Sequence, residues 1–273
     1  MENKNNEPEL RQFEDLAVAA AHAGGQLLAS KLGNVEIREK NPADFVTSAD
    51  LESQRIIQEM IDNRFPAHHF LGEESDEEQA VANAEKHEYC WIVDPLDGTT
   101  NYIHELRSFS VSIALRYRDE MIAGCVYDPI LKETFRATKG GGAFLNDQPI
   151  RPSRQTKTKD SLIVCSLPGK LTRDSWQLEQ LLNVLCESDG TIRRLGSTAL
   201  NLCFIACGRV DAYWSTKANI WDIAAGALIL EEAGAVMKHI SGEAVDYSDI
   251  KFIASATNDL NDRMRDLLRV PQV

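Results

Sequence analysis

The chain has no long hydrophobic run, and its first residues carry no export signal. Within its 273 residues, no apolar stretch approaches the roughly 20 residues that a membrane-spanning helix needs. The opening sequence MENKNNEPEL has neither the basic region nor the apolar region of a secretory signal. We therefore expect a cytoplasmic protein with no membrane partner.

Positive charge is scarce relative to negative charge. The chain has 29 Lys and Arg against 42 Asp and Glu, a formal net charge of −13. Because nucleic acids and anionic membranes attract basic surfaces, this balance argues against either of them as a partner. It also disfavours a nuclease or phosphodiesterase, which needs a basic groove for its substrate.

Cysteine is scarce too, and its spacing argues against cysteine-based sites. The six cysteines form no C-x-x-C pair, and most lie in apolar stretches. We therefore expect reduced thiols in the core, in preference to disulfides or a zinc site. They are Cys90, Cys125, Cys165, Cys186, Cys203 and Cys207.

Apolar residues at regular spacing predict helices and strands in both halves of the chain. In the first half the pattern predicts helices over 9–31 and 48–65, a strand over 35–38, and an antiparallel meander over 111–117, 121–127 and 133–138. The glycines at 140–142 lack the G-K-[ST] ending of a phosphate loop, so we expect a hairpin bend there.

In the second half, strands and helices alternate. We expect strands over 161–166, 191–194 and 210–214, and helices over 174–187, 196–207 and 221–233, the last ended by Gly234. The polar, basic segment RPSRQTKTK, residues 151–159, is the best candidate boundary. It predicts an N-terminal α+β half, 1–152, and a C-terminal α/β half, 153–273.

The stretch WIVDPLDGTTNYI, residues 91–103, is the most informative part of the chain. It predicts a buried strand that ends at Asp94 and a helix that begins after Asp97 and Gly98. Carboxylate and carbonyl oxygens suit Mg²⁺, and the free N–H groups of a helix start suit a phosphate oxygen. One turn could hold both, although Asp, Pro and Gly are also ordinary turn residues.

Other candidate side chains have a structural explanation when taken singly. Asp50 and Asp222 each fall in the first turn of a predicted helix, where a carboxylate favours the helix dipole. Glu73 follows an apolar pair and Gly72, but it begins an acidic run that is typical of a solvated face. His68 and His69 have no third ligand nearby, and we expect them on the surface.

Taken together, these residues resemble the inositol monophosphatase family. Residues 91–102 are similar to its first signature, and Trp221 to Gly226, WDIAAG, to its second. Further matches occur in order at 44–50, 72–75, 142–146 and 196–199, so that the resemblance runs from the first helix to about residue 258. It implies a five-layered αβαβα sandwich of the inositol monophosphatase and fructose-1,6-bisphosphatase type, and a homodimer.

The resemblance also implies the members of a site that uses two or three Mg²⁺ ions. One ion would be held by Glu73, Asp94 and the carbonyl of Leu96, a second by Asp94, Asp97 and Asp222, and a third more weakly near Glu73. Lys40 would lie near the outer metal. The chain's negative charge agrees with this, since bound divalent cations would reverse the local sign for a phosphate substrate.

By the same resemblance, Thr99 with Asp50 would orient and deprotonate the attacking water. The N–H groups of Gly98 and Thr99 would hold the phosphate. The implied substrate-binding residues are Glu73, Gly98, Thr99, Gly196, Ser197, Thr198, Ser215 and Asp222. The implied function is an Mg²⁺-dependent, lithium-sensitive phosphomonoesterase that hydrolyses a small phosphorylated metabolite by in-line attack.

The identity of the substrate stays open. Animal members have a Glu that binds inositol seven residues before the second-signature Asp, and here that position is Ser215. A neutral, shorter side chain cannot make the same charge-assisted hydrogen bonds. Relatives act on fructose 1,6-bisphosphate or histidinol phosphate, and Lys217 could meet a second anionic group. A metal-binding regulatory protein on the same fold is the non-enzymatic alternative.

Overall fold

The computed structural model describes residues 7–41, 44–75, 86–168, 171–173, 175–189, 191–247 and 249–269. It describes all side chains in these ranges except those of residues 7, 8, 40, 41 and 44. The Lys40 side chain, which was expected near the outer metal, therefore lies outside the described residues. So does most of the acidic run that follows Glu74.

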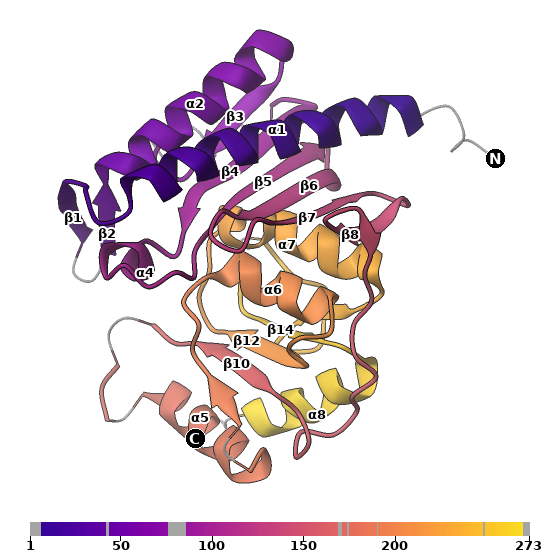
Figure 1. Ribbon diagram of the computed structural model, residues 1–273. Helices are drawn as coiled ribbons and strands as arrows, with labels where there is room; N and C mark the ends of the chain where they lie inside the picture. The colour runs from indigo at the N-terminus through magenta and orange to yellow at the C-terminus, as the bar shows by residue number, and fades with distance from the viewer. Residues whose placement is uncertain are drawn as a thin grey trace.

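The elements form five layers, helices and sheets in alternation (Figure 1). Helices α1 (Glu7–Lys31) and α2 (Ser48–Arg64) cover the outer face of a seven-stranded sheet. Helices α6 (Thr198–Ala206) and α7 (Ile220–Ala233) separate it from a five-stranded sheet. Helices α5 (Trp176–Glu187) and α8 (Asn258–Leu268) cover the far face. This confirms the predicted αβαβα sandwich.

The seven-stranded sheet is a meander with one parallel pair at its edge. Only β3 and β4 are parallel, and each later pair is antiparallel, as the sequence predicts. The glycines at 140–142 form the β7–β8 hairpin. In spatial order the strands are β3 (His69–Gly72), β4 (Tyr89–Asp97), β5 (Ser110–Tyr117), β6 (Glu120–Asp128), β7 (Glu133–Thr138), β8 (Gly142–Leu145) and β9 (Gln148–Pro149).

The five-stranded sheet is mixed. Strand β10 pairs in parallel with β11 and β12, whereas β14 pairs antiparallel with β12 and β13. The sequence pattern predicts β10, β11 and β12, and it assigns nothing after Gly234. In spatial order the strands are β11 (Ile192–Arg193), β10 (Ile163–Ser166), β12 (Ala212–Ser215), β14 (Phe252–Ser255) and β13 (Val236–His239).

Two local features differ from the sequence expectation. The strand expected over 35–38 is β1 (Ile37–Asn41), and it pairs with β2 (Asp44–Thr47), which the sequence pattern did not predict. Strand β4 continues past the expected end at Asp94 to Asp97, with an irregular register between Asp94 and Asp97. The helix after it, α4 (Thr99–Ile103), has only five residues.

Four buried clusters lie at the four junctions between layers. The first joins α1 and α2 to the large sheet through side chains such as Phe13, Ile57 and Trp91. The second and third lie on opposite sides of α6 and α7, and the fourth joins the small sheet to α5 and α8. The middle helical layer is therefore buried on both of its faces.

Close packing in the first layer depends on Gly24. A Cβ atom at this position would lie 2.7 Å from the Ser53 hydroxyl oxygen and 3.0 Å from the Ile57 Cδ1. The glycine therefore brings α1 against the face of α2 that carries Ser53, at the cost in helix stability that a glycine brings.

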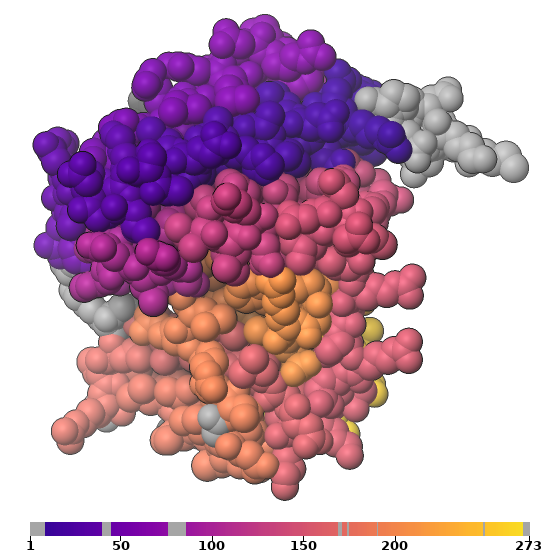
Figure 2. Space-filling view, viewed as in Figure 1, coloured from indigo at the N-terminus to yellow at the C-terminus, as the bar shows by residue number. Residues whose placement is uncertain are grey.

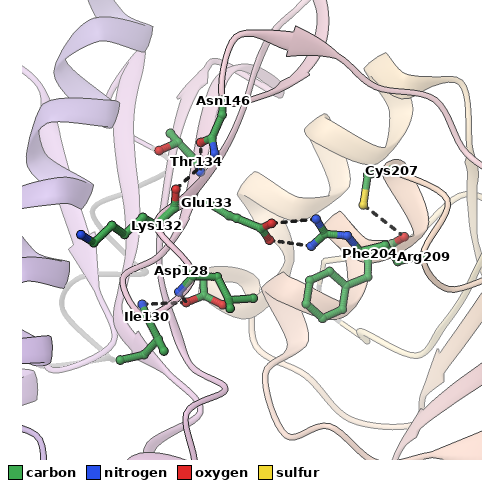
Figure 3. A network of polar contacts seen from close by, with 10 residues as sticks. Asp128, Ile130, Lys132, Glu133, Thr134, Asn146, Phe204, Cys207 and Arg209 are labelled. Carbon is green, nitrogen blue, oxygen red and sulfur yellow. Dashed lines mark hydrogen bonds and ion pairs between the residues drawn. The ribbon is translucent and has the colours of Figure 1, made fainter.

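The two halves of the chain are also joined by an ion pair at the surface. Arg209, after α6, donates two hydrogen bonds to Glu133 at the start of β7, at 2.5 and 2.7 Å (Figure 3). The guanidinium of Arg209 lies 5.6 Å from the centre of the Phe204 ring. Figure 2 shows atoms of the first and second halves of the chain packed against each other in the view of Figure 1.

The expectations for cysteine and for membrane spans can be compared with the structure directly. All six cysteines are free, and Cys90, Cys125, Cys165 and Cys203 are buried, whereas Cys186 is exposed. Among the described residues, no helix is long and apolar enough to cross a membrane.

His68 does not lie on the open surface, contrary to the sequence expectation. Its ring stacks between Phe65 and Tyr89, with centroids 4.7 and 4.4 Å away. Its Nδ1 accepts a hydrogen bond from the indole N–H of Trp91 at 3.1 Å. This bond requires an unprotonated Nδ1, and burial lowers the pKa of His68 below its usual 6.5.

We expect the pH dependence of stability to include a contribution from His68. The pKa of His68 is lower in the folded chain than in the unfolded chain. Its contribution to the free energy of unfolding is therefore complete above about pH 6.5, and it is lost as the pH falls below that value. The melting temperature of the parent should therefore fall more between pH 7.5 and pH 5.5 than that of a His68→Phe variant, which keeps the stacking. Equal falls, measured by scanning fluorimetry, would contradict this role.

Candidate active site

The parallel pairing of β3 and β4 places two candidate carboxylates at one edge of the large sheet. Gly72 pairs with Val93, and the N–H of Glu73 donates to the Val93 carbonyl at 3.0 Å. Glu73, the residue after Gly72 and β3, and Asp94, the residue after Val93 in β4, therefore lie side by side. The side chains of Glu73 and Asp94 interact by a hydrogen bond.

Asp94 is 2% exposed and lies where several negative charges meet. Burial raises its pKa well above the usual range, and the charges of Glu73, Asp97 and Asp222 raise it further. One of its oxygens accepts from the Leu96 N–H at 3.0 Å. The structure thus brings four of the predicted carboxylates into one electrostatic neighbourhood.

Asp97 connects the end of β4 to the beginning of α6. Its carboxylate accepts from the N–H of Thr198 at 3.0 Å and of Ala199 at 2.8 Å. The hydroxyls of Ser197 and Ser110 also donate to it. Burial raises the pKa of Asp97, and these four hydrogen bonds oppose the rise. Two of the predicted residues, Ser197 and Thr198, are therefore adjacent to Asp97, whereas Gly196 lies against Asn101.

Asp222 lies in the first turn of α7, where the sequence pattern placed it. It accepts from the Asn219 N–H at 2.7 Å and forms a capping box with that residue. Its side chain is partly accessible. Burial raises its pKa to about 7, and the charge of Asp97 contributes to the rise.

Asp50 is fully buried and faces Thr99. Thr47 donates to Asp50 Oδ2 through its N–H at 3.0 Å and through its hydroxyl. This leaves Oδ1 for the Thr99 hydroxyl, which lies 3.4 Å away and also donates to the Leu96 carbonyl at 3.1 Å. Burial raises the pKa of Asp50 to about 6, and the charge of Glu74 adds to the rise.

Gly98 allows the chain to turn between Asp97 and α4. Its φ is +106°, in the left-handed region that favours glycine, and a Cβ would lie 3.2 Å from the Ser108 carbonyl oxygen. Its carbonyl accepts from the Tyr102 N–H at 3.0 Å, which starts the short helix. The N–H groups of Gly98 and Thr99 come at the beginning of this turn.

Ser215 ends β12 and is 1% exposed. Its hydroxyl donates to the Lys217 carbonyl at 2.9 Å and accepts from the Lys217 N–H at 3.4 Å. The predicted substrate-binding side chain is thus engaged in a turn, and Lys217 itself is exposed.

Asn101 joins the two halves beside the candidate site, and the sequence analysis did not assign it a role. Its amide donates to the carbonyls of Ser108 and Leu195, both at 2.7 Å. Gly196 has a φ of +92°, and a Cβ there would lie 2.6 Å from this amide. The position of Asn101 within the first signature is the only sequence signal for it.

The donor chemistry of these residues fits a divalent metal. Among the described Lys, Arg and His side chains, none forms an ion pair with Asp94, Asp97 or Asp222. Buried carboxylates without a cation are costly, and hard oxygen donors are what Mg²⁺ prefers. By distance alone, however, no three Asp, Glu, His or Cys side chains in the described ranges form a group that could hold a metal. Asp97 and Asp222 instead have internal hydrogen bonds.

Comparison with known proteins identifies relatives over most of the chain. Residues 9–270 match the model of the inositol monophosphatase family. An inositol-1-monophosphatase of Mesorhizobium japonicum is 38% identical and is aligned over 84% of this chain and 85% of its own length. A Nus factor SuhB of Vibrio cholerae is 36% identical over 85% of this chain and 86% of its own length.

Solved structures agree with this assignment. The extragenic suppressor protein SuhB of Bartonella henselae has a TM-score of 0.87 and 36% identity, covering 93% of this chain and 97% of its own. An inositol monophosphatase of Anabaena has a TM-score of 0.82 and 33% identity, covering 96% of each chain. The chain therefore belongs to the inositol monophosphatase family and is a phosphatase, a phosphoric monoester hydrolase.

Proposed function

We propose that the protein is an Mg²⁺-dependent phosphomonoesterase that hydrolyses a small polyol or sugar phosphate by in-line attack of water. The observation that carries the proposal is the contact of the buried Asp50 with the partly exposed Thr99, which lies beside Leu96 and the neighbouring carboxylates. The family is generally metal-dependent, which supports the metal requirement. The homodimer that the resemblance implies, and the cytoplasmic location expected from the sequence, form part of the same proposal.

The residues proposed to hold the metals are those that the resemblance implies. Glu73, Asp94 and the Leu96 carbonyl would hold one Mg²⁺, and Asp94, Asp97 and Asp222 a second, with a third near Glu73. When bound, Mg²⁺ supplies charge neutralisation for the phosphate and acidifies a water molecule. The Leu96 carbonyl already accepts from Thr99, and its oxygen has a second lone pair for a metal.

Thr99 and Asp50 are proposed to move the proton of the attacking water. Thr47 fixes one oxygen of Asp50, so that the other faces the Thr99 hydroxyl. Thr99 would orient the water through its hydroxyl oxygen, and Asp50 would take the proton that Thr99 relays. A pKa of about 6 suits Asp50 to accept a proton near neutral pH and to release it afterwards.

The phosphate is proposed to bind at the beginning of α4, through the N–H groups of Gly98 and Thr99. Ser197 and Thr198 approach the same region from the other half of the chain, although both now donate to Asp97. These contacts favour a site between the two halves, since each half supplies donors to it.

The organic part of the substrate is proposed to be a polyol or sugar, with an inositol phosphate as the first candidate. Several relatives are named inositol-1-monophosphatase, which supports this class. Ser215 cannot provide the charge of a Glu, so fructose 1,6-bisphosphate and histidinol phosphate remain alternatives within the same fold. The resemblance extends to phosphatases of 3′-phosphoadenosine 5′-phosphate, which usually carry a D-G-T-K/R-x-F variant, and Thr100 and Asn101 argue against that substrate here.

The function is tested by phosphate release from inositol 1-phosphate, fructose 1,6-bisphosphate, histidinol phosphate and 3′-phosphoadenosine 5′-phosphate, with and without Mg²⁺. We expect Mg²⁺-dependent release with a clear preference for one substrate, and a loss of release on addition of a chelator. Asp94→Asn is the control variant, because it removes one proposed ligand and leaves the hydrogen bonds of Asp97 to α6 in place. Release that persists in this variant or without metal would contradict the proposal.

The Asp50–Thr99 pair generates a second prediction. Asp50→Asn should lower kcat by roughly 10²- to 10⁴-fold, the range for a lost general base. In the parent, kcat should rise with pH through about 6 as Asp50 loses its proton, and the variant should lack this rise.

Thr99 provides the matched comparison. Thr99→Ser keeps the hydroxyl and should retain most of kcat, whereas Thr99→Ala should lose it to a similar degree as Asp50→Asn. If Thr99→Ala and Thr99→Ser had the same kcat, the hydroxyl would have no part in proton transfer.

Lys217 tests the bisphosphate alternative. Its side chain is exposed after β12, where it could meet a second anionic group. If the substrate is a bisphosphate, Lys217→Ala should raise KM for fructose 1,6-bisphosphate and leave KM for a monophosphate unchanged. Bisphosphate turnover that is the same in parent and variant would remove Lys217 from substrate recognition.

A further inference from the structure

We propose that Gln54 is a positioning residue that sets the affinity of the site for divalent metal by holding the turn that carries Glu73. The inference rests on the proposed function, in which Glu73 binds metal. Gln54 is in the middle of α2 and is 8% exposed, which is unusual for a side chain of this polarity. Its role in the proposed site comes from its contacts.

The side-chain amide of Gln54 spans the turn that follows β3. Its Oε1 accepts from the Glu74 N–H at 2.9 Å, and its Nε2 donates to the Ser75 hydroxyl at 3.4 Å. The turn is closed by a hydrogen bond from the Ser75 N–H to the Gly72 carbonyl at 3.1 Å. Glu73 thus lies between Gly72, which accepts the hydrogen bond that closes the turn, and two residues, Glu74 and Ser75, that Gln54 contacts.

Gly72 shows that the turn and Gln54 are fitted to one another. A Cβ at position 72 would lie 2.3 Å from Gln54 Oε1 and 2.7 Å from its Cδ. Both distances are shorter than real contacts of a Cβ atom, so any other residue at 72 would displace the amide. A Cβ at position 72 would therefore require both the Gln54 amide and the Phe70 ring, which is also 2.7 Å away, to move.

The same face of α2 fixes two other parts of the proposed site. Asp50, Ser53 and Gln54 lie at spacings of three and four residues, on one side of the helix. Asp50 faces Thr99, and the Ser53 hydroxyl donates to the Pro95 carbonyl at 3.1 Å. Gln54 adds a third contact from this side of α2. The same helix therefore contacts both the turn that carries Glu73 and the segment 94–96.

The part of Gln54 that matters for the turn is its side-chain acceptor, the Oε1 to which the Glu74 N–H donates at 2.9 Å. Groups that orient a metal ligand typically change metal affinity by roughly 10- to 100-fold when they are removed. Loss of the Gln54 acceptor should therefore weaken metal binding and leave the proton-transfer pair intact.

The test compares metal binding by Gln54→Leu, Gln54→Glu and Gln58→Leu. Gln54→Leu removes the acceptor, Gln54→Glu keeps an acceptor at the same reach, and Gln58→Leu makes the same change one turn further along α2. Calorimetric titration with Mg²⁺ alone, without substrate, measures the dissociation constant. Phosphate release at increasing Mg²⁺ then separates metal affinity from kcat at saturation.

We expect Gln54→Leu to raise the Mg²⁺ dissociation constant by roughly 10- to 100-fold, with kcat at saturating Mg²⁺ within about threefold of the parent. Gln54→Glu and Gln58→Leu should stay within about threefold in both. An unchanged dissociation constant for folded Gln54→Leu, or a merely lower melting temperature, would overturn the role of Gln54. A parent that binds no Mg²⁺ would instead overturn the proposed function.

Discussion

The whole arrangement depends on the burial of one carboxylate, Asp97, between a strand end and a helix start. Asp97 belongs to the large sheet, but three of its four hydrogen-bond donors, Ser197, Thr198 and Ala199, lie where α6 begins. A carboxylate is favourable at the positive end of a helix, and the N–H groups there have no partner within the helix. Asp97 therefore fixes how the middle layer meets the first sheet. The site and the fold use the same side chain.

A second consequence of this arrangement is electrostatic. Asp94 is buried among the charges of Glu73, Asp97 and Asp222, and its pKa rises because like charges and low polarity both disfavour ionisation. Such a group lowers the stability of the folded chain unless a cation joins it. Enzymes commonly hold their functional groups at a cost in stability of this kind. The cost is concentrated at the junction of the two halves.

The sequence predicted the layers and the candidate carboxylates because these leave local or extended patterns. Helix spacing, strand alternation and the two signatures are all readable along the chain, and they placed Asp94 and Asp222 correctly on their elements, whereas Asp97 lies in β4 and not at the helix start. The roles of Gln54 and Asn101 could not be predicted, because each depends on a segment distant in sequence: Glu74 in one case and Leu195 in the other. His68 was misplaced for the same reason, since Tyr89, which stacks on its ring, and Trp91, which donates to its Nδ1, both lie in β4. Strand β2 is short, and it is recognised as a strand only by its pairing with β1.

The middle helical layer has a consequence for how the molecule can come apart. Helix α6 contributes Ala199 and Cys203 to one buried cluster, and Leu202 and Ile205 to the cluster on its opposite side. Helix α7 is shared in the same way. If either sheet were removed, one face of these helices would be exposed to water at a large hydrophobic cost. We infer that residues 1–152 and 153–273 depend on one another for stability, because α6 and α7 need a sheet on each side to bury both of their apolar faces.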